Sequence, residues 1–453
     1  MEENKDLLIE VRELIAQEKW AEVKSLLEDQ HIQDVSYVLS ELDEETQTPI
    51  FKALDRPLWA EVFAYLEHND QIRLLDALSQ EEGRFILQNM AADDRTAFLE
   101  RLPEEDMRNL LRLLPPRDVK QALRLLGYPE ESVGRLMTPH FVAVRPEWSI
   151  AQAMEHVRQQ SEEGETVNVI YVTDDNGQLL DMIELKRFIL GKPEEKVEQI
   201  MEDTVVSVTV TEDREEAVQK IQHYDIEALP VADDRGRLVG IVTVDDVLDV
   251  AEAESTEDFH KMGSVGVLNL NLNQASPWLL FQKRIGWLLI LVFVNMFAGE
   301  IIGAYEEAIE GLFVLMTFLP LVVDSGGNAG TQSATLMVRA LATGDVKMRD
   351  WLKLFGKELG VAAALGTAMA VAVFLVAFFW RTEMALDVSM VIALGMIGVV
   401  VVGSLVGMLL PFVLTRLNLD PATASAPLIT SIADLAGIAM YFFIAAAVLG
   451  LSV

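Results

Sequence analysis

An aspartate in the last long apolar run is the residue whose position most requires a chemical role. Asp434 lies about ten residues into this run, so in a helix it stands ~15 Å from the start, near the centre of a bilayer. A carboxylate at that depth is costly unless it faces water, a cation or a partner. Thr430, Ser431, Gly437 and Tyr441 fall on the same helical face, which predicts a polar stripe lining an ion pathway. A helix-helix hydrogen-bonding contact is the alternative interpretation.

A second polar group interrupts the second apolar run. The segment from Asp324 to Ser333 contains three glycines together with Asn328 and Gln332. Irregular backbone at membrane depth is tolerated only where it is buried in protein or lines a wet cavity. The segment therefore predicts a broken helix that faces a pathway or a close helix crossing, with the carbonyl of Asn328 available to a hydrated ion.

A third group consists of acidic residues just before the first apolar run. Residues 244–258 carry seven acids and no base. Crowded like charges destabilise a compact state unless cations lie among them, whereas a solvated linker helix is the simpler interpretation. On a helix the acids divide between two faces, with Asp245, Asp249 and Glu252 on one and Glu254, Glu257 and Asp258 on the other.

The charge of the front portion excludes some partners. Of the 71 acidic and 36 basic residues, 59 and 27 precede Lys283. Such a surface repels nucleic acid and anionic lipid and concentrates cations, although solubility alone is an adequate explanation of acidity. The chain has no cysteine, which excludes disulfides, thiolate metal sites and cysteine nucleophiles.

Five apolar runs, at 285–304, 311–340, 355–380, 388–415 and 424–450, are long enough to cross a bilayer. Bases flank the first run at Lys283 and Arg284, crowd the link between the second and third runs, and include Arg416 in the last link. By the positive-inside rule the amino terminus is cytoplasmic and the carboxyl terminus external. The sequence thus predicts an all-α transmembrane domain of five spans at 284–453 in a cytoplasmic (inner) cell membrane.

Two repeats organise the front portion. In residues 1–131, Leu42, Leu66, Met90 and Leu114 recur every 24 positions, and a leucine follows each by twelve, which predicts an all-α superhelix of short helices. Asp94 belongs to another repeated place, shared with Asp70 and Asp118.

A second repeat, at 132–198 and 199–252, has two short β-α-β-β-α copies whose Asp-Asp-x-Gly turns predict hairpins. These copies resemble a tandem pair of α/β CBS domains. In many CBS domains a Thr and an Asp three residues later contact the ribose of an adenine nucleotide, and Thr243 and Asp246 match that pattern. The first copy departs from it, with Asp181, Glu184 and Arg187 in the corresponding places, so the resemblance implies at most one site for ATP or a related nucleotide.

The chain as a whole resembles the MgtE magnesium transporters. The motifs that carry the resemblance run from Gly326 to Thr335, from Leu419 to Ala422 and from Asp434 to Gly437. The resemblance implies a homodimer in the lipid bilayer with the pore between the two membrane domains, and it implies that Asp434 binds the hydrated ion. It also adds Asp420 to the pore candidates. Ala426 stands where other members offer a polar Asn.

The same resemblance makes residues 245–275 a plug helix and linker. In the family, intracellular Mg²⁺ bridges acids of this helix, the CBS domains and the amino-terminal domain and holds the pore shut. The bridging acids of the other domains are then Asp94, Asp213, Glu215 and Asp225. Loss of Mg²⁺ lets repulsion separate the domains and release the helix.

The predicted function is transport of Mg²⁺, without enzymatic activity, by a channel driven by the membrane potential and closed by regulatory Mg²⁺. A site of hydrated-ion oxygen ligands suits Mg²⁺ and discriminates poorly against similar cations, so Co²⁺ transport is the nearest alternative. A membrane-tethered nucleotide sensor is a second alternative. An intramembrane aspartyl protease would use Asp324 and Asp434, but Asp324 precedes its glycines and the Gly-x-Gly-Asp signature is missing.

Overall fold

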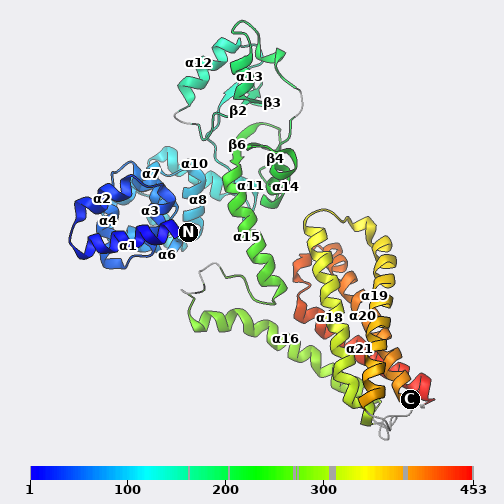
Figure 1. Ribbon diagram of the computed structural model, residues 1–453. Helices are drawn as coiled ribbons and strands as arrows, with labels where there is room; N and C mark the ends of the chain where they lie inside the picture. The colour runs from blue at the N-terminus through cyan, green and yellow to red at the C-terminus, as the bar shows by residue number, and fades with distance from the viewer. Residues whose placement is uncertain are drawn as a thin grey trace. The chain divides into compact units, whose positions relative to one another are not determined.

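The computed structural model describes residues 2–161, 164–202, 205–268, 272, 275–305, 313–380 and 386–450. These form two compact units, Met1–Glu252 and Ala253–Val453. The first contains the amino-terminal helices and the two α/β repeats, and the second contains the long apolar helices (Figure 1).

Short helices fill the amino-terminal part of the first unit. The positions repeated every 24 residues all join one hydrophobic core, in which Leu54, Leu66, Met90 and Leu114 are buried. The helical repeat predicted from the sequence is therefore confirmed. The helices are α1 (Glu2–Ala16), α2 (Trp20–Glu28), α3 (Ile32–Ser40), α4 (Glu44–Ala53), α5 (Leu58–Ala64), α6 (His68–Ala77), α7 (Gln80–Asn89), α8 (Ala92–Glu100), α9 (Glu104–Leu111) and α10 (Pro116–Leu126).

Each α/β repeat has the predicted β-α-β-β-α order. The first comprises β1 (Ala143–Val144), α12 (Ile150–Gln160), β2 (Val169–Thr173), β3 (Leu179–Glu184) and α13 (Leu185–Leu190), after α11 (Val133–Leu136). The second comprises β4 (Val208–Thr209), α14 (Arg214–Tyr224), β5 (Ala228–Ala232), β6 (Leu238–Thr243) and α15 (Val244–Met262), after η1 (Val197–Gln199).

Within each repeat the first strand pairs parallel to the second, and the second pairs antiparallel to the third. The hairpins turn at Gly177 and Gly236, whose positive φ values of 81° and 75° confirm the predicted turns. In the second repeat Thr243 pairs with Ala228 at the end of the sheet, so Asp246 lies in the first turn of α15.

The amino-terminal helices pack directly on the second repeat. Ala92 of α8 and Leu125 of α10 share a hydrophobic cluster with Val133 of α11 and Val247 of α15. This contact brings the acidic amino end of α8, with Asp93 and Asp94, towards the start of α15. Apolar packing thus places acids from distant parts of the sequence together.

In the described residues of the second unit, five helices are long and apolar enough to cross a membrane. They agree with the predicted spans to within a few residues, except that the first begins earlier. They are α16 (Pro277–Ala304), α18 (Phe313–Ala342), α19 (Trp351–Trp380), α20 (Leu386–Arg416) and α21 (Ala426–Leu449), with the short turns η2 (Met348–Asp350) and η3 (Pro421–Thr423) between them. The links at 306–312 and 381–385, which bear on the predicted orientation, lie outside the described residues.

Helix α18 corrects one prediction. The segment from Asp324 to Ser333 is continuous α-helix, not the break that its glycines suggested. The reason is tertiary packing, because Gly326 and Gly330 lie against α20 and leave no room for a side chain. Glycine weakens an isolated helix by about 1 kcal/mol, and close helix packing in the membrane offsets this cost.

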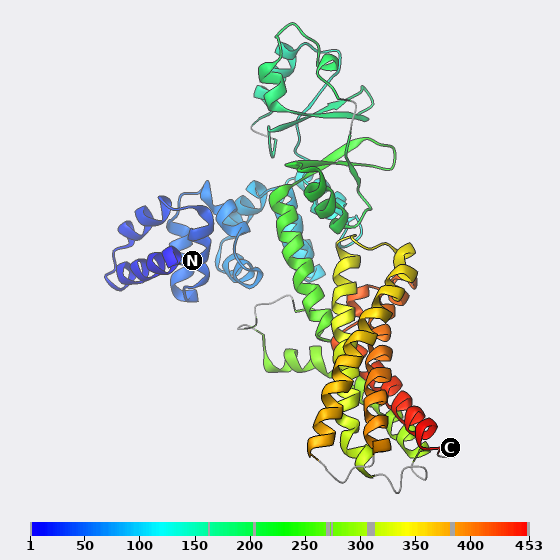
Figure 2. The same ribbon diagram turned by 45° about the vertical axis from the view of Figure 1, so that its right-hand side comes forward.

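Helix α20 occupies the middle of the bundle and packs against α18, α19 and α21, as Figures 1 and 2 show. Its Gly403 and Gly407 lie against the backbone carbonyls of Gly326 and Gly330 on α18. Helix α21 also packs against α18 and α16. The bundle therefore holds α18 and α21, which carry the polar residues at membrane depth, in a fixed register.

Candidate functional site

Asp434 is held in the middle of the bundle by the way α21 begins. Ser425 caps the helix by accepting a hydrogen bond from the Leu428 amide, and Pro427 occupies the first turn. Asp434 follows in the third turn, ~13 Å along the axis from Ser425. The cap therefore sets the depth at which the carboxylate stands.

The carboxylate of Asp434 faces α18 across a glycine. A Cβ on Gly327 would lie 3.2 Å from Asp434 Oδ1 and 2.9 Å from Thr430 Cγ2. Thr430 Oγ1 in turn lies 3.3 Å from Thr331 Oγ1 on α18. Among the residues that the structure describes, the buried Oδ1 of Asp434 has no hydrogen-bond partner. An unpartnered carboxylate oxygen at this depth is suited to a cation or its water shell.

Asn328 lies on the exposed side of the same part of α18. Its Nδ2 donates a hydrogen bond to Asp324 Oδ2 at 3.0 Å. Both residues are exposed in the single chain. Two polar groups thus lie beside the α18–α21 contact, one of which, Asp324, was not among the predicted pathway residues.

The other predicted pore residues lie elsewhere. Ser431 is buried in the bundle, and a Cβ on Gly437 would lie 2.9 Å from Val399, so this glycine serves the packing of α21 on α20. Tyr441 is also buried and donates to the carbonyl of Leu315 at 3.1 Å. The structure therefore places Asp434 and Thr430 together against Gly327, with Asn328 on the exposed side of α18, whereas Gly437 and Tyr441 serve the packing of the bundle.

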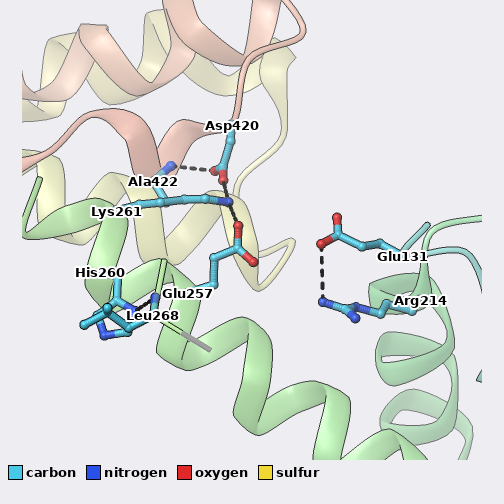
Figure 3. Close-up of polar contacts among 8 residues, drawn as sticks. All are labelled: Glu131, Arg214, Glu257, His260, Lys261, Leu268, Asp420 and Ala422. Atoms are coloured by element: carbon cyan, nitrogen blue, oxygen red, sulfur yellow. Dashed lines mark hydrogen bonds and ion pairs between the residues drawn. The ribbon is translucent and has the colours of Figure 1, made fainter. Parts of the chain in front are cut away.

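Asp420 belongs to a different cluster, at the carboxyl end of α15 (Figure 3). It caps η3 by accepting from the Ala422 amide at 2.8 Å, and it accepts from Lys261 Nζ at 2.6 Å. Lys261 also pairs with Glu257 at 2.5 Å. Although burial alone would lower the pKa of Lys261, its bonds to Asp420 and Glu257 raise it. A charged lysine thus joins the end of α15 to the link before α21.

Two further contacts belong to this junction. Ser264 Oγ lies 2.6 Å from Ser425 Oγ, the hydroxyl that caps α21. Burial, followed by the charge of Asp420, raises the pKa of Asp258. Three of the acids predicted to regulate the protein, Glu254, Glu257 and Asp258, therefore lie in the second unit with the membrane helices.

Three acids near the start of α15, Asp245, Asp246 and Asp249, line a large acidic cavity in the first unit. The cavity has a volume of about 1070 Å³ and lies between the amino-terminal helices and the second repeat. Its lining combines three acids predicted to bind regulatory metal, and Asp246 from the predicted nucleotide site, with others that were not among the predicted site residues. The acids that line it are Glu61, Asp93, Asp94, Asp118, Glu165, Asp245, Asp246 and Asp249, with Arg95, Arg117, His31 and His140 also present.

Burial and mutual repulsion act on the carboxylates of this cavity. Burial raises the pKa of Asp94, and the charges of Asp245 and Asp249 raise it further. Burial also raises the pKa of Asp246 to about 7, against the opposing effect of its bond with Thr243. Burial is also the main cause of the raised pKa values of Asp93, Glu165 and Asp249. These groups are more stable when they are neutralised by protons or cations.

Direct coordination of a metal ion is not evident in this cavity. Within the described parts of the chain, no three histidine or acidic side chains come close enough to hold one ion. Of the missed residues, Asp118 had a signal in the sequence, the helical repeat that it shares with Asp94. Glu165 had none, because it lies in a loop that only the fold brings to α15.

Two other predicted acids lie at the two ends of helix α14. Asp213 caps its amino end by accepting from the Glu215 amide at 2.9 Å. Asp225 ends the helix in the left-handed conformation, with φ 51°. Glu252 is on α15 at the end of the first unit. The ten predicted regulatory acids are therefore distributed over several places instead of one cluster.

The two residues predicted to bind nucleotide lie in the acidic cavity. Thr243 Oγ1 donates to Asp246 Oδ2 at 2.6 Å, so each satisfies the other. A second cavity, of about 690 Å³, is lined by both repeats and carries the bases Lys186 and Arg187. Arg187 pairs with Glu202 at its edge. Both cavities contain two lysine or arginine side chains, but eight acids line the acidic cavity and four line the second, so a phosphate group would meet less negative charge in the second.

The acidic cavity leads to a prediction about pH. Because the pKa of Asp246 in the folded state is about 7, above its ordinary 3.8, protonation stabilises the fold, and this stability is lost as pH rises through 7. For a fragment of residues 1–262, we expect the free energy of unfolding in urea to fall by about 2 kcal/mol from about pH 5 to about pH 8. Millimolar Mg²⁺ is expected to remove most of this fall.

The variant Asp246→Asn is the matched control for this experiment. Burial lowers the pKa of His68, so this residue makes the free energy of unfolding rise with pH. The contribution of His68 is the same in wild type and variant, so it cancels when their free energies of unfolding are subtracted. If the difference in free energy of unfolding between wild type and Asp246→Asn stays constant from about pH 5 to about pH 8, the role assigned to Asp246 is contradicted.

These features define a class of protein. Helices that can cross a membrane surround an aspartate with one buried oxygen that has no hydrogen-bond partner in the described parts of the chain. These helices follow an acidic helical domain and paired α/β repeats. The chain is a multi-pass membrane protein with the architecture of a cation transporter.

Comparison with known families identifies the chain further. Residues 319–444 match the family MgtE, described as a divalent cation transporter; residues 30–131 match the MgtE intracellular N domain; and residues 133–190 and 197–253 match the CBS domain. A relative named magnesium transporter MgtE, from Thermus thermophilus, is 40% identical over 320 residues, 70% of each chain. The chain belongs to the MgtE family of magnesium transporters.

Other relatives agree. A magnesium transporter MgtE from Bacillus subtilis is 32% identical over 322 residues, 71% of this chain and 70% of that one. The crystal structure of the cytosolic domain of the Mg²⁺ channel MgtE in complex with ATP has a TM-score of 0.51 and 34% identity, and it covers 54% of this chain and 99% of that chain. The crystal structure of the soluble part of a magnesium transporter has a TM-score of 0.52 and 27% identity, and the match covers 56% of this chain and 99% of that chain. The resemblance noted from the motifs is thereby confirmed.

Proposed function

We propose that the chain forms a channel that conducts Mg²⁺ down its electrochemical gradient past Asp434. The observation that carries this proposal is the buried oxygen of Asp434 that faces Gly327 and has no hydrogen-bond partner among the residues described. A carboxylate so placed binds a divalent cation with its water shell, which suits an ion that loses water reluctantly. A potential of about 100 mV supplies about 4.6 kcal/mol to a divalent ion, enough to drive uptake without ATP.

Two copies of the chain are proposed to enclose the pathway. The exposed side of α18 presents Asp324, Asn328, Gln332 and Thr335 within a helix long and apolar enough to cross a membrane. Charged and amide groups on a membrane-spanning face need water or a partner instead of lipid. A second copy facing this side would supply both. The proposed orientation has the amino terminus in the cytoplasm, as the distribution of bases favours.

The acidic cavity is proposed to act as the sensor of cytoplasmic Mg²⁺. Burial, and then the charges of Asp245 and Asp249, raise the pKa of Asp94, so bound cations would favour the compact arrangement of the first unit. Helix α15 carries acids of this cavity at its beginning and the Lys261 junction at its end. Cation binding would thus favour one position of α15 and close the pathway.

A nucleotide is proposed as a further ligand of the repeats. The related cytosolic domain was solved in complex with ATP. In this chain the cavity bearing Lys186 and Arg187 is the better place for a phosphate group than the acidic cavity with Thr243 and Asp246.

Uptake by reconstituted protein tests transport and gating together. Protein in liposomes, with the cytoplasmic face accessible, is driven by an imposed potential while Mg²⁺ on that face is varied. Wild type is expected to conduct Mg²⁺ and to be closed by Mg²⁺ in the millimolar range. The variant Asp94→Asn/Asp245→Asn/Asp249→Asn is expected to need at least about tenfold more Mg²⁺ for closure, because the cavity has lost three charges that attract the cation.

A matched variant neutralises three exposed acids in turns, Asp175→Asn/Asp234→Asn/Glu194→Gln, and is expected to close like wild type. Equal inhibition of the cavity variant and this control would remove the sensor role. Absence of any Mg²⁺ flux in folded protein would favour a membrane-tethered nucleotide sensor, and equal flux of Co²⁺ would broaden the substrate to octahedral divalent cations.

A further inference from the structure

Helix α18 exposes a carboxylate, that of Asp324, to which no role in binding the ion has been assigned. Asp324 is exposed in the single chain, near the middle of a helix of 30 residues. An ionised side chain at such a depth is retained in a membrane protein where it faces water, an ion or another polar group. Its hydrogen bond with Asn328 joins it to the polar side of α18, and Thr331 lies seven positions further on the same face.

The packing of α18 on α21 places Asp324 close to the level of Asp434. Three contacts show that the two helices are antiparallel: Thr331 meets Thr430, Gly327 meets Asp434, and Leu315 meets Tyr441. In this register Asp324 stands opposite residues near Gly437. At 1.5 Å per residue, the two aspartates differ in level by about 4–5 Å, less than one helical turn.

The two carboxylates present different oxygens to this region. Asp434 Oδ1 is buried against Gly327 and has no hydrogen-bond partner within the described residues. Asp324 is held from one side by the Asn328 amide, which acts on Oδ2. Because the glycine between them has no side chain, nothing on α18 at Gly327 separates Asp434 from the polar side of the helix.

We propose that Asp324 is a second carboxylate of the cation pathway, one step from Asp434 towards the amino-terminal end of α18, and that Asn328 positions it. This inference rests on the proposed role of Asp434. A hydrated divalent cation between two carboxylates is attracted twice as strongly as a monovalent one at each of them. Asp324 therefore raises the affinity for divalent cations and their selection over monovalent cations.

The first test compares uptake of Mg²⁺ by folded variants in liposomes. Asp324→Asn is expected to raise the apparent KM for Mg²⁺ about tenfold, because one of two attracting charges is lost, and to lower the ratio of Mg²⁺ to K⁺ flux. Asp324→Glu keeps the charge and is expected to retain most of the affinity. Asp387→Asn, an exposed carboxylate at the start of α20, is the matched control and should behave like wild type.

A chemical test uses the absence of cysteine from the sequence. Asp324→Cys introduces the only thiol, which is then modified with a negatively charged or a positively charged methanethiosulfonate. The negative reagent is expected to restore Mg²⁺ affinity, and the positive reagent to reduce flux below that of the unmodified variant. Mg²⁺ should slow both modifications, since it occupies the same place.

The outcomes separate this inference from the proposed function. If Asp434→Asn stops uptake while Asp324→Asn keeps the wild-type KM and selectivity, Asp324 has no role in the pathway and the proposed function stands. Failure of the thiol introduced by Asp324→Cys to react with either reagent also overturns the inference, because the position is then not reached by water. Wild-type uptake by both Asn variants overturns the role of both residues.

Discussion

Replacing Asp434 by asparagine is expected to reduce Mg²⁺ uptake by about 100-fold or more, with the membrane domain still folded. A divalent cation near a carboxylate in a partly shielded site gains several kcal/mol, and about 3 kcal/mol already corresponds to a factor above 100. Asparagine keeps the size of the side chain and removes only the charge. The measurement is dye-detected uptake in liposomes at a fixed potential, with size-exclusion profiles to show that the variant is folded.

Asp387→Asn serves as the matched control, since it removes an exposed carboxylate from the start of α20. Asp434→Glu is expected to retain partial activity, because the charge remains but extends further towards Gly327. Uptake by Asp434→Asn equal to that of Asp387→Asn would show that Asp434 serves the packing of α21 on α18 and not conduction.

The second large effect is expected from the glycines between α18 and α20. Gly407→Leu should abolish the folded membrane domain, because a side chain at this position would occupy the space of the Gly330 backbone on α18. Overpacking in a well-packed core costs about 1–3 kcal/mol, and a clash with backbone on an adjacent helix should exceed this range. The readout is the fraction of monodisperse protein after extraction and its melting temperature.

Gly360→Leu is the control, because a Cβ at Gly360 of α19 would meet nothing within 4 Å. Protein with Gly407→Leu that is as monodisperse and as heat-resistant as the control would mean that α18 and α20 can separate at little cost. In that case the register between Gly327 and Asp434 could not be attributed to this helix contact.

The membrane spans could be predicted closely because they depend on local composition. Length and hydropathy alone located the five long apolar helices found in the described part of the chain. The start of α16 was missed because Pro277 to Arg284 mix apolar and polar residues ahead of the apolar run. The break predicted between Asp324 and Ser333 was wrong for a different reason. Glycine content reports the propensity of an isolated helix, whereas these glycines are contacts between helices.

For the polar residues too, the sequence predicted features within one helix but not contacts between helices. Helical periodicity correctly grouped Asp245 with Asp249, because both belong to one element and line one cavity. It also grouped Gly437 with Asp434, although the glycine packs against Val399. A helical wheel gives the direction of a side chain but not which neighbouring helix lies there.

Residues that meet only through the tertiary fold could not be found in this way. Glu165 lies in a loop between α12 and β2, and its position beside the acids of α8 and α15 depends on how the repeats pack on the amino-terminal helices. The pairing of Lys261 with Asp420 joins residues 159 positions apart. Neither contact has a period or motif that marks it in the sequence.

Current recordings in planar bilayers test the central claim most directly, with Mg²⁺ as the main permeant ion and no ATP present. For a conducting pathway selective for a divalent ion, we expect the reversal potential to move by about 30 mV for each tenfold change in the Mg²⁺ gradient. The current should vanish in Asp434→Asn. A reversal potential that ignores the Mg²⁺ gradient, or Mg²⁺ movement that requires ATP, would contradict a channel that conducts Mg²⁺ past Asp434.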